Sequence, residues 1–334
     1  MNIVDLSGYS FTGKSAVYDL ISEGDYYSHG KEFEFDLIRV QGGLLDLRQA
    51  LTQENWSPVR SSEAVRNFLR LVHHMGGDKS LISRLRRSGA NYDYYLPGFS
   101  LLTNEFAGSL VEASWRCEWP FALYSHDKES LTAIKLARKF GFSRDDIVYL
   151  ARLSKAEFDA KSREYFERLF APIAAKGFRW LVLNNAFEPF SPERSIELFD
   201  HAKSIVVDRD PRDVYISALR AGKIEGSQVG RSVTGDSVSN FISRFRIYRS
   251  GVTILSPHVY RMKFESLVLD YEAEVIRIRT FLGDASVATS SQGRAFDPAN
   301  SVRNVGQWKR LDDLRLLDDV AVIKSELSEY CLDV

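Results

Sequence analysis

The sequence predicts a three-layer α/β fold, in which helices flank a central parallel sheet, together with a helical insertion. Short continuous apolar runs alternate with helical patterns along most of the chain. The runs lack the polar alternation of a half-exposed strand, as expected for parallel strands that are buried on both faces. The first run leads through a glycine-containing turn into a helix, which gives a strand–turn–helix unit at residues 1–23.

The first half of the chain continues from that unit into a long helical region. Residues 1–6 are β-compatible, residues 8–15 form a turn, and residues 16–23 carry apolar side chains at helical spacing. A second strand is predicted near residues 33–38. Residues 45–125 are mostly helical in pattern, and we expect them to form an insertion that binds the substrate.

The second half returns to alternating strands and helices, and we expect all 334 residues to form a single domain. Strands are predicted at residues 121–124, 180–183, 204–207 and 260–264. Helices are predicted at residues 155–175 and 271–282 and from residue 311 onward, with Gly283 closing the second of them.

The composition narrows the classes of function. The formal net charge is −1, so no overall field attracts the chain to nucleic acid or to an anionic membrane. No run approaches the ~20 apolar residues of a membrane-spanning helix, and the N-terminus lacks the pattern of a secretory signal. The two cysteines, Cys117 and Cys331, form neither a metal cluster nor a disulfide framework. We therefore expect a soluble cytoplasmic protein whose phosphate sites are local.

A phosphate-binding loop is predicted at residues 8–15, whose sequence GYSFTGKS matches G-x-x-x-x-G-K-[ST]. Glycines let the backbone fold around an anion with its N–H groups inward, and the following helix points its N-terminus at the same anion. Lys14 adds a positive charge, and the Ser15 hydroxyl can bind a phosphate oxygen or a metal. The flanking strand and helix favour a P-loop over the alternative, a structural turn that happens to match.

A second anion-binding pattern lies at residues 204–217, which read as strand, charged turn and helix. Pro211 suits the first turn of a helix. Arg209 lies at the carboxyl end of the strand, where open α/β sheets bind ligands, and Ser217 follows eight residues later. On spacing alone, the alternative is a solvated charged turn that caps the helix.

At these residues the chain resembles the sulfotransferases that use 3′-phosphoadenylyl sulfate (PAPS), of bacterial type and similar to carbohydrate and cell-surface sulfotransferases. Their 3′-phosphate motif has an Arg at the strand end, an Asn/Asp-Pro-Lys/Arg-Asp turn, and a Ser eight residues after the Arg. The resemblance therefore implies that Arg209 and Ser217 hold the 3′-phosphate. An Arg and a hydroxyl are suitable donors for phosphate.

Two further segments extend the resemblance. Residues 260–267, with the helix that ends in Phe-Leu-Gly at 281–283, are similar to the family's strand, acidic-x-Leu and helix. Residues 301–309 are similar to its C-terminal loop over the nucleotide, with Arg303 as a phosphate contact. The matching pieces run from about residue 5 to about residue 311. Residues 45–175 carry no family signature, and we expect them to determine the acceptor.

The resemblance implies PAPS as donor, 3′,5′-ADP as product, and no metal, because a sulfuryl group carries less charge than a phosphoryl group. Lys14 and the loop amides would stabilise the leaving group. The residues that we expect to bind the donor are Ser10, Phe11, Thr12, Gly13, Lys14, Ser15, Ala16, Arg209, Ser217 and Arg303.

The loop departs from the family at one position. The family usually has Lys/Arg-Ser/Thr-Gly-Thr-Thr/Ser, and aligning its glycine with Gly13 places Phe11 at the basic position. Lys14 then occupies a position that is usually Thr. We expect Lys14 to reach the same phosphosulfate bridge from the other side of the glycine, as P-loop lysines reach the β/γ bridge.

The catalytic base is expected among acidic residues near the second predicted strand. Glu32, Glu34 and Asp36 alternate with aromatic residues, so they share one face of an extended segment. The resemblance implies a base about twenty residues after the loop glycine, an interval that Glu32 and Glu34 bracket. We predict Glu34 as the base, then Glu32, then His29, while salt bridges or a solvated strand edge are the alternative.

Other polar residues end the strand predicted at residues 180–183. Asn184 and Asn185 follow it directly and are expected to face the site.

Two other classes of function compete with the sulfotransferase. A P-loop kinase or NTPase would use residues 8–15 for ATP, Asp208 for Mg²⁺, and Arg209 with Arg212 as phosphate clamps. The Arg209/Ser217 pair and the loop at residues 303–308 favour the sulfotransferase. A non-catalytic nucleotide-sensing protein is the third class, supported by Phe11 at the basic position. The family suggests a glycan or glycolipid acceptor, and the oligomeric state is left open.

Overall fold

The computed structural model describes residues 1–31, 33–77, 91–117, 121, 128–140, 146–222, 237–252, 256–284 and 296–332. The chain divides into two compact units. The first contains Met1–Phe35, Ile173–Ile196 and His201–Val334, and the second contains Asp36–Pro172 and Glu197–Asp200. Among the helices in these described ranges, none has both the length and the apolar character needed to cross a bilayer.

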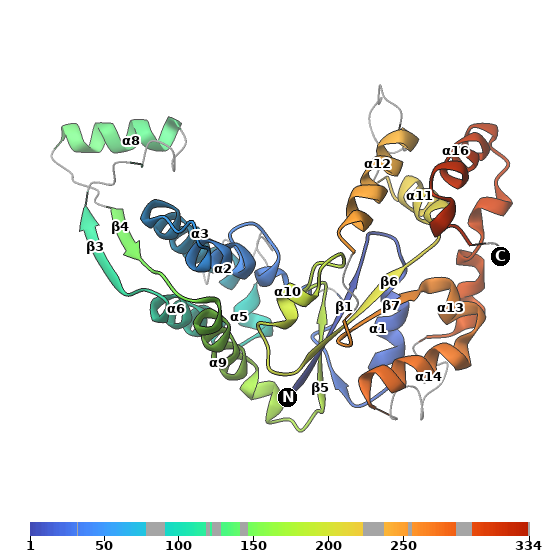
Figure 1. The fold of residues 1–334 in the computed structure, drawn as a ribbon, viewed down its shortest axis with the longest axis horizontal. Helices are drawn as coiled ribbons and strands as arrows, with labels where there is room; N and C mark the ends of the chain where they lie inside the picture. Colours follow the sequence, from blue (N-terminus) through green and yellow to red (C-terminus); the bar gives the residue numbers. More distant parts are fainter. Residues whose placement is uncertain are drawn as a thin grey trace. The chain divides into compact units, whose positions relative to one another are not determined.

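The first unit is built on a five-stranded sheet of order β2-β5-β1-β6-β7, in which all neighbouring strands are parallel (Figure 1). The parallel sheet with flanking helices confirms the predicted α/β fold. Because β1 lies between β5 and β6, the loop that follows β1 starts at the middle of the carboxyl edge, where such sheets bind ligands. The strands are β1 (Asn2–Gly8), β2 (Tyr26–Tyr27), β5 (Trp180–Asn184), β6 (Ala202–Asp208) and β7 (Val259–Lys263).

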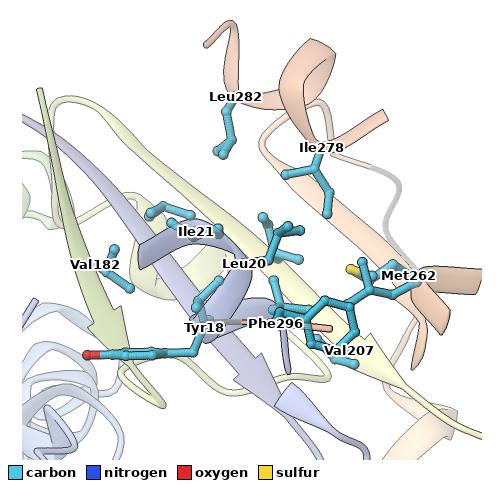
Figure 2. Close-up of a cluster of buried hydrophobic side chains, with 14 of the residues drawn as sticks. Tyr18, Leu20, Ile21, Val182, Val207, Met262, Ile278, Leu282 and Phe296 are labelled. Carbon is cyan, nitrogen blue, oxygen red and sulfur yellow. The ribbon is translucent and has the colours of Figure 1, made fainter. Parts of the chain in front are cut away.

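One face of this sheet packs against α1 (Lys14–Ser22), α13 (Phe264–Leu269) and α14 (Tyr271–Leu282). The shared apolar cluster includes Val4 and Leu6 of β1. Leu20, Ile21, Ile278 and Leu282 join it from the helices (Figure 2). Because alternate residues of a strand point to opposite faces, Asp5 and Ser7 of β1 point away from this cluster. The terminus of α14 follows the sequence prediction, since Gly283 takes the left-handed φ of 69° that favours glycine.

A second apolar cluster of the first unit joins α11 (Pro211–Arg220), α12 (Ser237–Ser250) and α16 (Leu314–Glu326). Its buried side chains are Val214, Tyr215, Val238, Phe241, Ile242, Phe245, Ile323 and Leu327. The remaining short elements of this unit are α10 (Glu193–Ile196), α15 (Pro298–Ser301), η2 (Val302–Asn304), η3 (Gln307–Arg310) and η4 (Ser328–Tyr330). The cluster fixes α11 at the carboxyl end of β6, where the second predicted anion site lies.

The second unit is mainly helical and has its own aromatic core. Phe106 contacts the rings of Phe68, Phe158 and Tyr165, and Arg48 bonds the buried Asp159 at 3.1 Å. Its elements are η1 (Asp36–Ile38), α2 (Leu44–Thr52), α3 (Pro58–Gly76), α5 (Tyr92–Tyr95), α6 (Phe99–Ser109), α8 (Lys128–Lys139) and most of α9 (Lys155–Ala174), with the antiparallel pair β3 (Ala113–Cys117) and β4 (Asp146–Leu150).

The strand predicted at residues 33–38 is wrong. Phe33 and Phe35 are buried and Glu34 is only partly buried, so the alternation of a strand is present. The backbone nevertheless forms no regular element before η1, although Phe35 N donates to Asn184 O at 3.1 Å. The strand beside β5 is instead the two-residue β2. Of the strand predicted at residues 121–124, all but the first residue lie outside the described residues.

Candidate functional site

The phosphate loop between β1 and α1 depends on both glycines of its motif. Gly13 has a φ of 87°, and a Cβ added there would lie 2.4 Å from the ring of Phe264. A Cβ on Gly8 would lie 2.7 Å from Thr12 Oγ1 and 3.1 Å from Val207 O. Larger residues therefore do not fit at either position without displacing a neighbour.

The inside of the loop is ordered by its own hydrogen bonds. Thr12 donates to Tyr9 O through both its backbone N at 3.3 Å and its hydroxyl at 2.8 Å, and Ala16 N donates to Gly13 O at 2.9 Å. Thr12 is buried, whereas Ser10 and Ser15 are exposed. Since α1 begins at Lys14, its first turn presents N–H groups at the loop, which is the ordinary arrangement of an anion site.

Lys14 and the predicted base Glu34 lie close together. Lys14 Nζ lies 2.5 Å from Asn184 Oδ1 and 3.4 Å from Glu34 Oε1. Asn185 Nδ2 donates to the same Glu34 oxygen at 2.6 Å. The Lys14 side chain is 17% exposed and that of Glu34 is 40% exposed, so a ligand can reach both groups. The two asparagines therefore connect the lysine and the carboxylate of one site.

The two other candidate bases differ from Glu34. Glu32 lies outside the described residues. His29 packs edge-on against the rings of Tyr27 and Phe33, with centroid distances of 5.0 and 5.3 Å. Burial, with a smaller contribution from the charge of Lys176, lowers the pKa of His29 to about 4, so its imidazole is neutral near pH 7.

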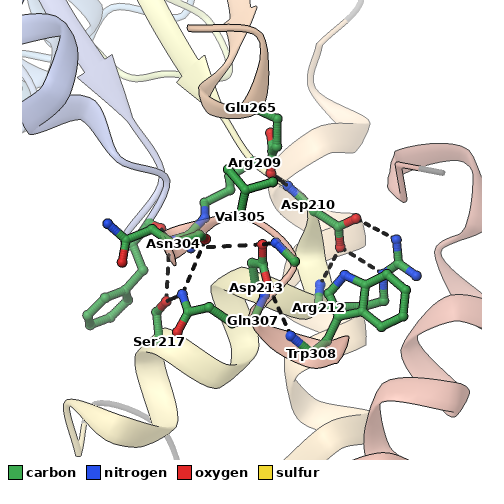
Figure 3. Close-up of polar contacts among 12 residues, drawn as sticks. Arg209, Asp210, Arg212, Asp213, Ser217, Glu265, Asn304, Val305, Gln307 and Trp308 are labelled. Carbon is green, nitrogen blue, oxygen red and sulfur yellow. Dashed lines mark hydrogen bonds and ion pairs between the residues drawn. The ribbon is translucent and has the colours of Figure 1, made fainter. Parts of the chain in front are cut away.

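Arg209 joins the phosphate loop to two other segments (Figure 3). Its guanidinium donates to Phe11 O at 3.0 Å, to Ser217 Oγ at 3.2 Å and to Asn304 O. The side chain is buried, and this burial lowers the pKa of the guanidinium from its very high ordinary value. One cation thus connects the loop, helix α11 and the C-terminal segment.

Asp213 fixes the C-terminal segment beside Arg209. Its carboxylate accepts the backbone N–H groups of Gly306 at 2.8 Å, Gln307 at 2.7 Å and Trp308 at 3.4 Å. Gln307 Nε2 then donates to Ser217 Oγ at 3.1 Å. Asp213 and Gln307 were not among the predicted site residues, although an acidic residue four positions after Arg209 was a usable signal.

The neighbouring charged residues have structural partners. Asp210 caps α11 by accepting Arg212 N at 2.9 Å, and it also binds the Arg212 guanidinium through Nε at 2.9 Å and through a second nitrogen at 2.6 Å. The guanidinium lies 3.9 Å from the centroid of the Trp308 ring. Asp210 N donates to Glu265, a carboxyl whose pKa is raised to about 7 by burial. Arg303, by contrast, is exposed on η2.

Asp208, the residue that would bind Mg²⁺ in a kinase, forms an ion pair. Arg249 donates to both of its carboxylate oxygens, to one of them at 3.2 Å. The Arg249 guanidinium is buried and lies 4.0 Å from the ring centroid of Tyr9 and 3.3 Å from that of Phe245. A carboxylate neutralised in this way is a poor magnesium ligand.

A cavity of about 380 Å³ adjoins the first half of the phosphate loop. Its size is within the range of small-molecule sites. Its lining comes from the loop, α11 and α12, and is mostly apolar. The lining residues are Tyr9, Ser10, Phe11, Val214, Ala218, Phe241, Arg244, Phe245, Tyr248 and Arg249.

No protein-family model and no curated protein sequence matches the chain. Several solved structures are similar to it. A sulfotransferase domain from the curacin biosynthetic pathway is 15% identical, with 98% of this chain and 97% of that chain covered and a TM-score of 0.37. A sulfotransferase domain of the Synechococcus PCC 7002 olefin synthase is 14% identical, with 96% and 94% covered and a TM-score of 0.38. A sulfotransferase of Mycobacterium tuberculosis H37Rv is 13% identical, with 98% and 76% covered and a TM-score of 0.39.

Proposed function

We propose that this chain is a sulfotransferase that moves the sulfuryl group of PAPS to a hydroxyl or amine of an acceptor and forms 3′,5′-ADP. One observation carries the proposal: the Arg209 guanidinium donates both to the phosphate loop, at Phe11 O, and to Ser217 Oγ. The two anion-binding patterns therefore lie within the reach of one side chain. A nucleotide with anionic groups on both its 5′ and 3′ oxygens matches that pair of sites.

The 3′-phosphate would bind at Arg209 and Ser217. Within the described part of the chain, Nε of Arg209 is buried without a hydrogen-bond partner, and a phosphate oxygen would satisfy it. The hydrogen bonds of Arg209 go to neutral oxygens, with the Asp213 carboxylate 4.0 Å from the guanidinium, and exchanging one of these oxygens for a phosphate would give a stronger, charge-assisted bond. Gln307, positioned through Asp213, would close the site from the C-terminal segment.

The 5′-phosphosulfate would bind the loop amides from Thr12 to Ser15. Lys14 would neutralise charge on the oxygen that bridges phosphorus and sulfur as the bond between that oxygen and sulfur breaks. Glu34 would accept the proton of the acceptor hydroxyl while its oxygen attacks sulfur in line. Asn185 fixes one oxygen of that carboxylate, which keeps the base oriented. No metal is needed in these steps.

The kinase alternative is less consistent with the same residues. Asp208 pairs with the buried Arg249, and Arg212 is bonded to Asp210 through two nitrogens of its guanidinium. Neither is therefore disposed to bind Mg²⁺ or a γ-phosphate without losing an existing ion pair.

For the acceptor, we retain the proposal of a glycan or glycolipid, acted on in the cytoplasm. The cavity next to the loop has aromatic walls from Phe11, Phe241 and Phe245, which suit an apolar part beside the accepting hydroxyl. Among the expected acceptors, a glycolipid has such a part. We also retain the proposal of one functional domain whose helical region at residues 45–125 selects the acceptor.

A turnover assay tests the function. The protein is incubated with PAPS and separate glycan, glycolipid and simple alcohol acceptors, and 3′,5′-ADP and sulfated products are measured by mass spectrometry. We expect acceptor-dependent 3′,5′-ADP formation that is lost in Arg209→Ala and kept in the control Arg246→Ala, whose side chain is exposed and pairs with Glu326. Phosphorylation of an acceptor by ATP with Mg²⁺, and no use of PAPS, would refute the proposal.

A further inference from the structure

Asp5 is a carboxyl group buried in the middle of β1, three residues before the phosphate loop begins. It points away from the apolar cluster that surrounds Val4 and Leu6. Its Oδ1 accepts Ala186 N at 2.8 Å, and its Oδ2 contacts the hydroxyls of Ser7 and, at 3.5 Å, Ser204. These partners are backbone amides and hydroxyls, whereas a buried carboxylate ordinarily needs a cation beside it.

Ser7 has one hydroxyl proton and two acceptors within reach, one of which is Asp5. Ser7 Oγ lies within hydrogen-bond distance of both Asp5 Oδ2 and, at 3.0 Å, Phe187 O. A hydroxyl has one proton, and a carbonyl oxygen can only accept. Ser7 can donate to an ionised Asp5, but when Ser7 donates to Phe187 O instead, its contact with Asp5 requires a proton on Asp5.

The burial of Asp5 favours its protonated form. Burial raises the pKa of Asp5 to about 7, and hydrogen bonds from Ser7, Ala186 and Phe187 and the charge of Lys14 oppose part of that rise. Lys14 acts on Asp5 from α1, the turn after β5 contributes backbone groups of Ala186 and Phe187, and Ser204 of β6 contributes a hydroxyl. A proton on Asp5 is therefore available near neutral pH.

The turn that Asp5 holds also carries the contacts of Lys14 and Glu34. Ala186 follows Asn184 and Asn185, whose side chains bond the lysine and the carboxylate. Asn185 has a left-handed φ of 53°, and its N donates to Leu6 O at 3.0 Å. Asp5 and the backbone of β1 thus fix the position of both asparagines.

We propose that Asp5 is a positioning residue of the donor site that acts in its neutral form and holds the Asn184–Ala186 turn. Because a neutral Asp5 does not offset the positive charge of Lys14, that charge can act fully on the bound anion. This inference rests on the proposed binding of an anionic nucleotide at the loop. An ionised Asp5 would place a buried negative charge near the same lysine and would oppose the anion. By linkage, nucleotide binding then favours protonated Asp5, so binding takes up a proton.

Calorimetry of 3′,5′-ADP binding at about pH 8, in buffers of different ionisation enthalpy, measures this proton. Wild type should take up more protons than Asp5→Asn, and its affinity should fall by about tenfold relative to the variant between pH 6.5 and 8.5. The phosphates of the nucleotide titrate alike with both proteins, so the difference isolates Asp5. The control Asp312→Asn, at an exposed position, should behave as wild type.

Asparagine resembles the neutral acid, since its Oδ1 can accept Ala186 N–H and its Nδ2 can donate to Ser7. We therefore expect Asp5→Asn to fold, and failure of this variant to fold would count against the proposal. A second measurement uses the wild type: ¹³C NMR of labelled aspartate should contain one carboxyl that titrates near neutral pH and is absent from Asp5→Asn.

The outcomes separate this inference from the proposed function. Tight binding with equal proton uptake by wild type and Asp5→Asn would overturn the role of Asp5 and leave the donor site standing. Failure of wild type to bind 3′,5′-ADP under any condition would overturn both.

Discussion

Replacing Asp213 by asparagine should weaken nucleotide binding without unfolding the chain. The carboxylate accepts two short hydrogen bonds, from Gly306 N at 2.8 Å to one oxygen and from Gln307 N at 2.7 Å to the other. An asparagine offers only one accepting oxygen, so its NH₂ group must face one of these N–H groups. The substitution therefore removes one charge-assisted bond, weakens the second and releases the segment that carries Gln307 to Ser217.

The expected size of the effect follows from these bonds. A hydrogen bond to a charged group contributes about 1.5–3 kcal/mol. If this free energy is lost only from the nucleotide-bound protein, the dissociation constant rises roughly 10- to 150-fold. Calorimetry with 3′,5′-ADP measures the constant, and hydrogen exchange measures protection of the amides of Gly306 and Gln307. Asp313→Asn is the matched control, because Asp313 also accepts a backbone N–H, from Arg315 at 2.9 Å, but caps α16.

Two results would refute this reasoning. One is an Asp213→Asn protein that binds the nucleotide as tightly as wild type with both amides equally protected. The other is an equal loss of affinity in Asp313→Asn, which would indicate a general effect of removing an acidic cap.

Three further predictions concern the loop, the base and a buried carboxyl. Glu34→Gln should lower kcat by about 10²- to 10⁴-fold while the dissociation constant of 3′,5′-ADP stays within about twofold, and unchanged kcat would exclude Glu34 as the base. Gly13→Ala should destabilise the fold by about 1–3 kcal/mol in urea unfolding, because of its φ of 87° and the 2.4 Å approach to Phe264; wild-type stability would contradict this. Burial raises the pKa of Glu265 to about 7 from an ordinary 4.5, so the neutral form stabilises the fold. Its contribution to the free energy of unfolding, at most about 3 kcal/mol, should be complete below about pH 4.5 and lost as the pH rises through about 7. Glu265→Gln should remove this dependence of the free energy of unfolding on pH, and an unchanged dependence would contradict the assignment.

The parts of the site that the sequence predicts are those encoded by local spacing. Residues 8–15 and the pair Arg209/Ser217 each lie within one strand–turn–helix unit, so the motif determines their relative positions. The fold class follows for the same reason, because each strand is recognisable from its own apolar run.

The other parts depend on strand order and on loops that meet through the tertiary fold. The contact between Lys14 and Asn184 exists because β5 pairs with β1, and no local pattern specifies that neighbour. Asp213 bonds residues more than ninety positions later, for which only a general acidic signal was present. The strand predicted at residues 33–38 follows the alternation of acidic and aromatic residues there, yet alternation alone does not provide a hydrogen-bonded partner.

The most direct test of the donor site compares the dissociation constants of 3′,5′-ADP, 5′-ADP and ATP with Mg²⁺ for the wild type, in one buffer at one salt concentration. The site described here predicts metal-independent binding of 3′,5′-ADP at least about tenfold tighter than 5′-ADP, since Arg209 and Ser217 would bind the extra phosphate. Equal affinity for the two diphosphates, with a preference for ATP and Mg²⁺, would contradict the account and favour a kinase.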